Sequence, residues 1–198
     1  MKRAIVIQGP TNYYELMSST WKGDKIISTW ENEKIKIKKN EILVLNKIPR
    51  EKGTANLNLQ KISTLNGLLK AKELGYKRAI KTRSDLFPTD FQQFEKLLNT
   101  NYRLNATYWC LNDDGYIVDY IYEGEIDTLI DCFSFDDIYP EYAEKSLNKN
   151  IMKVCDPREI NFYGNFLSPT NDLVWIKNSK TLYHHYSNHH KFINYVPK

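Results

Sequence analysis

Cysteine is scarce in this chain, which contains only Cys110, Cys132 and Cys155 among 198 residues. The three are widely spaced and form no C-x-x-C pair, the spacing typical of zinc fingers and dithiol redox sites. Their odd number also argues against a disulfide framework. We therefore expect three structural thiols in a reducing compartment.

Long apolar runs are also missing. The first run leads from the basic start to Gln8 and has only four residues, which is too short for a signal peptide. No later run could span a bilayer. We therefore expect a cytoplasmic, soluble protein, and peripheral membrane contact through a partner or a surface patch is the alternative.

A strong charge of either sign is absent as well. The 28 basic and 24 acidic side chains give a net charge of +4, and the densest basic run, residues 34–39, is typical of a solvated face. Nucleic-acid binding calls for a basic stripe interleaved with aromatic residues. We expect no nucleic-acid partner.

What the sequence does contain is a regular alternation of strand and helix signals in its first half. With 41% hydrophobic residues it can build a full core. The alternation predicts an α/β fold with a mostly parallel sheet flanked by helices, in a single domain over residues 1–198. Strands are expected at 4–7, 25–30, 41–46, 78–82, 107–111 and 117–122, a turn at 113–115, and helices at 11–21, 62–69, from 88 onward, 125–133 and 136–148.

The clearest candidate site follows the strand at 78–82, which ends in Arg83-Ser84-Asp85. Ligands of open α/β sheets bind outside the carboxyl ends of the strands. An arginine can direct two donors at a diphosphate, and a carboxylate such as Asp85 can hold a hard divalent cation. The structural alternative is a surface ion pair.

Two earlier strand ends offer further candidates. Gln8-Gly9-Pro10 ends the first strand, either as a tight turn or as a corner where Gly9 lets a flat ligand approach the backbone. Its spacing matches no dinucleotide or phosphate-loop motif. The second strand ends in Ser28, Thr29, Trp30 and Glu31, where an aromatic ring and a carboxylate could contact a nucleoside or be a buried tryptophan beside a surface acid.

Polar residues are also dense where the main helix opens, more than one cap requires. A helix N-terminus with surplus donors suits a phosphate-bearing ligand. The residues concerned are Asn56, Asn58, Gln60, Ser63 and Thr64.

Asp119 lies among apolar and aromatic neighbours in the strand at 117–122. Such surroundings raise the pKa of a carboxyl group, which suits a general base, although a buried, hydrogen-bonded carboxylate is the alternative. Other acids nearby are Asp113, Asp114, Glu123, Glu125 and Asp127. The histidines at 184, 185, 189 and 190 fit no zinc spacing and are expected to be ordinary polar residues, although one could reach a cation beside Asp85.

Taken in order, several segments resemble the WavE family of proteins associated with lipopolysaccharide and surface-polysaccharide synthesis. They are Val6–Pro10, Ile27–Glu31, Asn58–Leu68, Lys81–Asp85, Asp119–Asp127 and Tyr139–Tyr142. That family resembles GT-A glycosyltransferases, which implies a Rossmann-like nucleotide-binding sheet and an Asp-x-Asp cation motif at a strand end. Arg83 stands where the first aspartate would be, so either Asp85 holds Mn²⁺ or Mg²⁺ with less help or Arg83 takes over part of the charge of the cation. The resemblance also places Lys81 among the substrate-binding residues.

The resemblance implies a glycosyltransferase that moves a sugar from a UDP-, GDP- or dTDP-linked donor to a surface glycan or glycolipid. Residues 1–100 would form the nucleotide-sugar half and 101–198 the acceptor half. Arg83 and Asp119 would be catalytic, Asp119 as the base of an inverting reaction. Two alternatives remain open: a sugar-nucleotide nucleotidyltransferase, which should carry a glycine-rich basic loop after its first strand, and a non-catalytic glycan-binding module.

Overall fold

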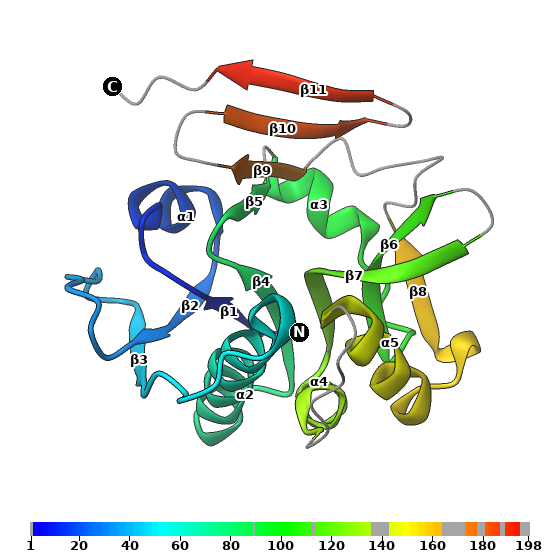
Figure 1. Ribbon diagram of the computed structural model, residues 1–198, viewed down its shortest axis with the longest axis horizontal. Coiled ribbons are helices and arrows are strands. Elements are labelled where there is room, and N and C mark those ends of the chain that lie inside the picture. The colour runs from blue at the N-terminus through cyan, green and yellow to red at the C-terminus, as the bar shows by residue number, and fades with distance from the viewer. Residues whose placement is uncertain are drawn as a thin grey trace.

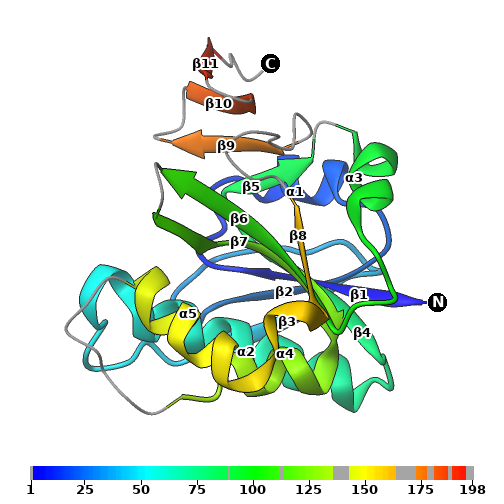
Figure 2. The same ribbon diagram turned by 90° about the vertical axis from the view of Figure 1, so that its right-hand side faces the viewer.

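Two β-sheets and two layers of helices form the computed structural model (Figure 1; Figure 2). It describes residues 2–88, 90–111, 114–135, 143–163, 173–177, 181–186 and 189–194. Within these ranges, none of the helices combines the length and the apolar character needed to cross a membrane.

The larger sheet has seven strands in the order β3-β2-β1-β4-β7-β6-β8. Its first four strands are parallel, whereas β7 runs antiparallel to both β4 and β6. The expected α/β fold with a mostly parallel sheet is therefore confirmed. The strands are β1 (Arg3–Gln8), β2 (Asp24–Trp30), β3 (Ile42–Asn46), β4 (Arg78–Arg83), β6 (Leu104–Leu111), β7 (Asp114–Glu125) and β8 (Ile160–Tyr163).

The smaller sheet is antiparallel and has the order β11-β10-β9-β5. Its strands are β5 (Leu86–Pro88), β9 (Leu173–Lys177), β10 (Thr181–Tyr186) and β11 (His189–Asn194). The four histidines lie on β10 and β11, where His185 pairs with His190, and their side chains fall outside the described part of the chain.

Helices cover the larger sheet on one face, and shorter helices with the smaller sheet cover the other (Figure 2). The first layer contains α2 (Leu57–Glu73), α4 (Ile126–Phe133) and α5 (Ala143–Val154), and the second contains α1 (Tyr14–Thr20) and α3 (Phe91–Leu97). Short 3-10 turns, Thr54–Asn56 and Pro157–Glu159, precede α2 and β8.

This two-sided cover explains the continuous apolar run of the first strand. Side chains alternate between the faces of a strand. Ala4 and Val6 therefore join the core beneath α2, while Ile5 and Ile7 join the core beneath α1 and α3. A strand buried on both faces has no polar side to show in its sequence.

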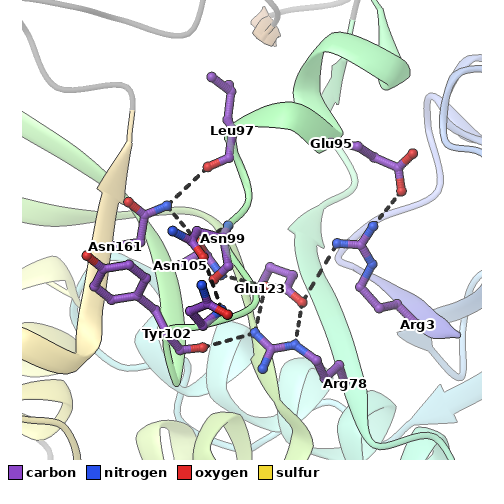
Figure 3. A network of polar contacts seen from close by, with 10 residues as sticks. Arg3, Arg78, Glu95, Leu97, Asn99, Tyr102, Asn105, Glu123 and Asn161 are labelled. Atoms are coloured by element: carbon purple, nitrogen blue, oxygen red, sulfur yellow. Dashed lines mark hydrogen bonds and ion pairs between the residues drawn. The ribbon is translucent and has the colours of Figure 1, made fainter. Parts of the chain in front are cut away.

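A buried polar network ties β4 to β7 at the amino end of the parallel strands (Figure 3). Arg78 donates to both carboxylate oxygens of Glu123 at 2.8 and 3.0 Å, and Asn105 donates to the same group at 2.6 Å. Arg3, the neighbour of Arg78 in the sheet, bonds to Glu95. Because every buried charge here is paired, the network fixes the antiparallel β7 beside β4 at the edge opposite to Arg83.

Three expectations about element boundaries were wrong or fall outside the described residues. Pro88 closes β5 instead of opening a helix, and Thr89 lies outside the described residues. Asp114 and Gly115 begin β7, so they are not a turn, while Asp113 is outside the description. The helix expected at 136–148 is described only from Ala143, and it runs on to Val154.

Candidate functional site

Three strand ends lie in register at the carboxyl edge of the parallel sheet. Gln8 pairs with Ser28 on one side and with Arg83 on the other. The backbone N–H of Ser84 donates to the Gln8 carbonyl at 2.8 Å, and that of Gly9 donates to the Ser28 carbonyl at 3.1 Å. The corner at 8–10 and the segment at 83–85 are therefore adjacent, as the topology predicts, at the edge where α/β sheets bind ligands.

Gly9 is required by the close packing of these two corners. Its φ is +117°, and a Cβ at this position would lie 2.6 Å from the Ser84 Oγ. Packing therefore accounts for the glycine, and contact between Gly9 and a flat ligand stays a prediction. Pro10, next along the corner, is exposed.

The inner face of α2 is joined to these strand ends by a chain of hydrogen bonds. The Ser63 Oγ donates to the Gln8 Oε1 at 2.9 Å, and the Ser28 Oγ donates to the Ser63 carbonyl at 2.6 Å. Asn46 continues the chain by donating to the Ser28 Oγ at 3.0 Å, and Asn66 donates to Asn46 at 2.8 Å. Asn46 and Asn66 were not among the site residues predicted from the sequence. The available signal was that Asn46 is the last residue of its strand, as Ser28 is close to the end of its own.

Ser63 and Ser28 are fully buried in this chain of bonds. Their observed role is to hold α2 against the sheet, and direct contact with a ligand stays a prediction. Thr64 and Thr29 are also fully buried, and neither hydroxyl has a hydrogen-bond partner among the described contacts. Trp30 is buried while Glu31 is exposed, which is the structural alternative for this segment.

The polar cluster expected at the start of α2 is more spread out than its sequence suggests. Ser63 lies in the second turn of the helix and faces the sheet, while the half-buried Asn58 donates to the Glu51 carbonyl at 3.0 Å and Gln60 is half-buried. The expectation that some of these side chains cap the helix was wrong at Asn56, which makes no capping hydrogen bond. Its φ of +63° differs from the extended backbone from which a side chain normally caps.

At the end of β4, the Arg83 guanidinium forms a two-pronged ion pair with Asp85. The Nε donates to Oδ1 at 2.9 Å and an Nη donates to Oδ2 at 2.7 Å. Both side chains are partly exposed, at 22% and 25%. The same guanidinium lies 3.7 Å from the Asp119 Oδ2 and stacks over the ring of Tyr120 at 5.9 Å. A ligand at this edge can therefore reach a fixed positive charge.

Behind Arg83 lies a second ion pair that is fully buried. The Lys81 Nζ donates to the Asp119 Oδ1 at 2.5 Å, and both side chains have no exposed surface. The Lys81 ammonium also lies over the rings of Tyr122 and Phe133, at 5.3 and 5.4 Å. From core to surface, Lys81, Asp119, Arg83 and Asp85 thus form a row of alternating charges, which we call the charge row.

The surroundings of the two cations in the charge row shift their pKa values in opposite directions. Burial lowers the pKa of Lys81, and the Asp119 carboxylate offsets part of that effect. Burial alone would lower the pKa of Arg83, but the carboxylates of Asp85 and Asp119 raise it above its usual value. Arg83 is therefore a permanent positive charge.

A bulge in β7 brings Asp119 into the charge row. Ala106 on β6 pairs with Tyr122, but two residues later Tyr108 pairs with Ile117, so β7 carries extra residues between these points. Asp119 and Tyr120 lie in this bulge, which re-aims side chains as such irregularities commonly do. Tyr120 was missed from sequence, and its only signal was its place next to Asp119.

Asp85 fits the expected divalent cation poorly. Both of its oxygens accept hydrogen bonds from Arg83, so a metal ion there would displace the guanidinium or lie beside it. Two unit charges of like sign 4 Å apart repel by about 4 kcal/mol near a protein surface, and a divalent ion doubles this. In the ranges that the structure describes, no group of three or more histidine, cysteine or carboxylate side chains could hold a metal.

Comparison with known proteins identifies the fold. The chain is similar to a crystal structure from Desulfovibrio desulfuricans G20 of a protein provisionally described as a nucleotide-diphospho-sugar transferase. The TM-score is 0.53 at 11% sequence identity, over 83% of this chain and 81% of the other. No family model matches the chain, and no curated protein matches it in sequence. The chain thus shares the fold of the Desulfovibrio protein, while membership of the WavE family stays a prediction.

Proposed function

We propose that this chain is a glycosyltransferase that transfers a sugar from a UDP-, GDP- or dTDP-linked donor to a glycan or glycolipid acceptor. The observation that carries the proposal is the register of Gln8, Ser28 and Arg83 at the carboxyl edge of a sheet with this fold. It sets a partly exposed guanidinium beside the two corners predicted to hold a nucleoside. A pyrophosphate bound between the guanidinium and these corners would lie next to a permanent cation.

The chemistry of sugar transfer needs such a cation. As the bond between the sugar and the nucleoside diphosphate breaks, the departing phosphate oxygen gains negative charge, and a pre-positioned donor stabilises it. Arg83 is suited to this task because Asp85, Asp119 and the Tyr120 ring hold its guanidinium in place. Ordering the side chain before the donor arrives lowers the entropic cost of binding.

Asp119 enters this proposal in two ways. Its predicted role is to accept the proton of the acceptor hydroxyl, which would require one of its oxygens to face the acceptor. Its observed contacts with Lys81 and Arg83 make it a positioning residue for both cations. An Asp119→Asn variant separates the roles, because loss of a base lowers kcat with an unchanged donor KM, whereas loss of positioning raises the donor KM.

The finer assignments rest on the WavE resemblance and the composition. They are a surface-glycan acceptor, a cytoplasmic location with peripheral membrane contact, and a division into a donor half and an acceptor half. These three assignments belong to the proposal, and the similarity of fold does not bear on them.

The test is a titration of the purified chain with UDP-, GDP- and dTDP-sugars, read by calorimetry and by release of the nucleoside diphosphate. We expect one donor to bind and to be slowly hydrolysed, and Asp85→Ala to abolish transfer without unfolding the chain. Full activity of that variant would refute the role of Asp85. Oligosaccharide binding without nucleotide affinity would favour a glycan-binding module, and formation of a nucleotide sugar from a sugar phosphate would favour a nucleotidyltransferase.

Arg158→Ala is a matched control for Arg83→Ala. Arg158 makes the same two-pronged pair with a carboxylate two residues away, Asp156, at 2.9 and 2.8 Å, but on an exposed turn. We expect the control to bind the donor like the parent chain, and Arg83→Ala to bind it roughly 10- to 100-fold more weakly, the usual cost of a lost charge-assisted hydrogen bond.

A further inference from the structure

We infer that donor binding and sugar transfer at this site do not use a divalent cation, because Arg83 occupies the place and supplies the charge that the metal would. This inference rests on the proposed function and adds to it how the diphosphate is neutralised. It departs from the metal dependence that the GT-A resemblance implies, and it follows from the contacts of four side chains.

The first step concerns Asp85, the main residue predicted to ligate the metal. Its two oxygens both accept hydrogen bonds from one guanidinium, with nearly ideal lengths of 2.9 and 2.7 Å. Such a two-pronged pair is the strongest and most directional contact between these groups. The contacts make Asp85 a positioning residue for Arg83.

The second step concerns the charge of the site. A Mg²⁺ ion bound to a nucleotide takes part of its ligands from the phosphates and needs one or two protein carboxylates to complete its shell. In the charge row each carboxylate already faces a cation: Asp119 pairs with Lys81 at 2.5 Å and lies 3.7 Å from Arg83. Two cations thus balance two carboxylates, so neither carboxylate offers an uncompensated negative charge to an incoming metal ion.

The third step concerns access. Lys81 and Asp119 are fully buried and Arg83 and Asp85 are partly exposed, so the guanidinium is the outermost cation of the row. Arg83 also lies in register with Gln8, beside the predicted nucleoside corner. A diphosphate at this edge could therefore reach the guanidinium, whereas it could not reach the buried Lys81.

The experiment measures the affinity of the full chain for UDP-, GDP- and dTDP-sugars by calorimetry, once with EDTA and once with millimolar Mn²⁺. We expect the preferred donor to bind with a Kd that changes less than about threefold between the two conditions, since a guanidinium does not depend on added metal. Binding of Mn²⁺ alone can be measured through the decrease of the electron paramagnetic resonance signal of the free ion. We expect no detectable decrease at millimolar Mn²⁺.

Variants at Asp85 further distinguish a role in positioning Arg83 from a role in binding a metal ion. Asparagine keeps an oxygen that accepts a hydrogen bond from Arg83 but is a weak metal ligand. We expect Asp85→Asn to bind the donor in EDTA more tightly than Asp85→Ala, with Arg158→Ala unchanged from the parent chain. Circular dichroism confirms that each variant is folded.

The outcomes are distinct. Donor binding that appears only with Mn²⁺, or equal loss in Asp85→Asn and Asp85→Ala in the presence of Mn²⁺, would overturn the inference and leave the proposed function intact. Failure of every donor to bind under both conditions would overturn the proposed function itself.

Discussion

Replacing Gly67 by alanine should destabilise the protein although alanine is the better helix former. Gly67 lies in the middle of α2, where the helix is packed closely against β1 and β2. An added Cβ would lie 2.4 Å from the Val6 Cγ1 and 3.1 Å from the Ser28 Cβ. Carbon atoms in contact prefer about 3.5–4.0 Å, so either the helix or the Val6 side chain must move.

The expected size of the effect follows from two opposing contributions. Overpacking a core costs about 1–3 kcal/mol, and the upper part of that range applies because Val6 is fully buried and β-branched side chains have few rotamers. Alanine recovers about 1 kcal/mol through its helix propensity. We expect Gly67→Ala to lower the free energy of unfolding by about 1–2 kcal/mol, and Tm by roughly 3–6 °C for a chain of this size.

Urea denaturation of a double-mutant cycle tests this reasoning. Val6→Ala removes the methyl group that the new Cβ would meet, so the double variant should lose about 1 kcal/mol less than the two single losses together. Leu69→Ala, at an exposed position of the same helix, serves as the control and should change stability by less than about 0.5 kcal/mol. A Gly67→Ala chain as stable as the parent would refute the packing argument.

Two further predictions concern buried charges. Asp119→Ala should lower the free energy of unfolding, measured by urea denaturation, by about 3–5 kcal/mol, because it leaves the Lys81 ammonium buried without its carboxylate. The double variant Asp119→Leu with Lys81→Met should lose less stability than Asp119→Ala. A double variant that is less stable than Asp119→Ala would contradict the role of the ion pair. Burial alone would raise the pKa of Glu41, but hydrogen bonds from Ser18 and Tyr14 hold that pKa below its ordinary value. The Glu41 carboxylate therefore stabilises the fold fully above about pH 4.3, and this contribution is lost as the pH falls through the lowered pKa. Glu41→Gln should thus be less stable than the parent at pH 7, with a gap that narrows below pH ~4; a constant gap would exclude this linkage.

The position of the candidate site could be predicted because it depends on topology alone. The strands that carry Gln8, Ser28 and Arg83 at or near their carboxyl ends are separated by helices in the sequence, so they had to be parallel and to end at one edge of the sheet. Gly9 was recognised as a special position because a glycine followed by a proline ends the first strand. Its actual neighbour, the Ser84 hydroxyl, comes from the turn after β4, more than seventy residues away, and left no trace in the sequence.

The contacts within the site could not be predicted, since they depend on antiparallel pairing in the second half of the chain. Asp119 faces Lys81 and Arg83 only because the bulge in β7 shifts its register against β6. A one-residue change of register turns every side chain of a strand to the opposite face. Lys81 itself, in the middle of the central strand β4, was a visible sign that a buried partner had to exist, but its position did not identify the carboxylate.

The arginine at position 83 changes how the end of β4 can bind a diphosphate. With two carboxylates two residues apart, the edge would be negative and would need a divalent cation before it could accept a diphosphate. With a guanidinium at the first position, the second carboxylate instead holds that guanidinium in place, and the edge itself supplies a cationic donor for a diphosphate. The buried pair of Lys81 and Asp119 then acts as the support for this arrangement, because Asp119 touches both cations. The four residues are therefore one unit, and the contribution of any one of them depends on the other three.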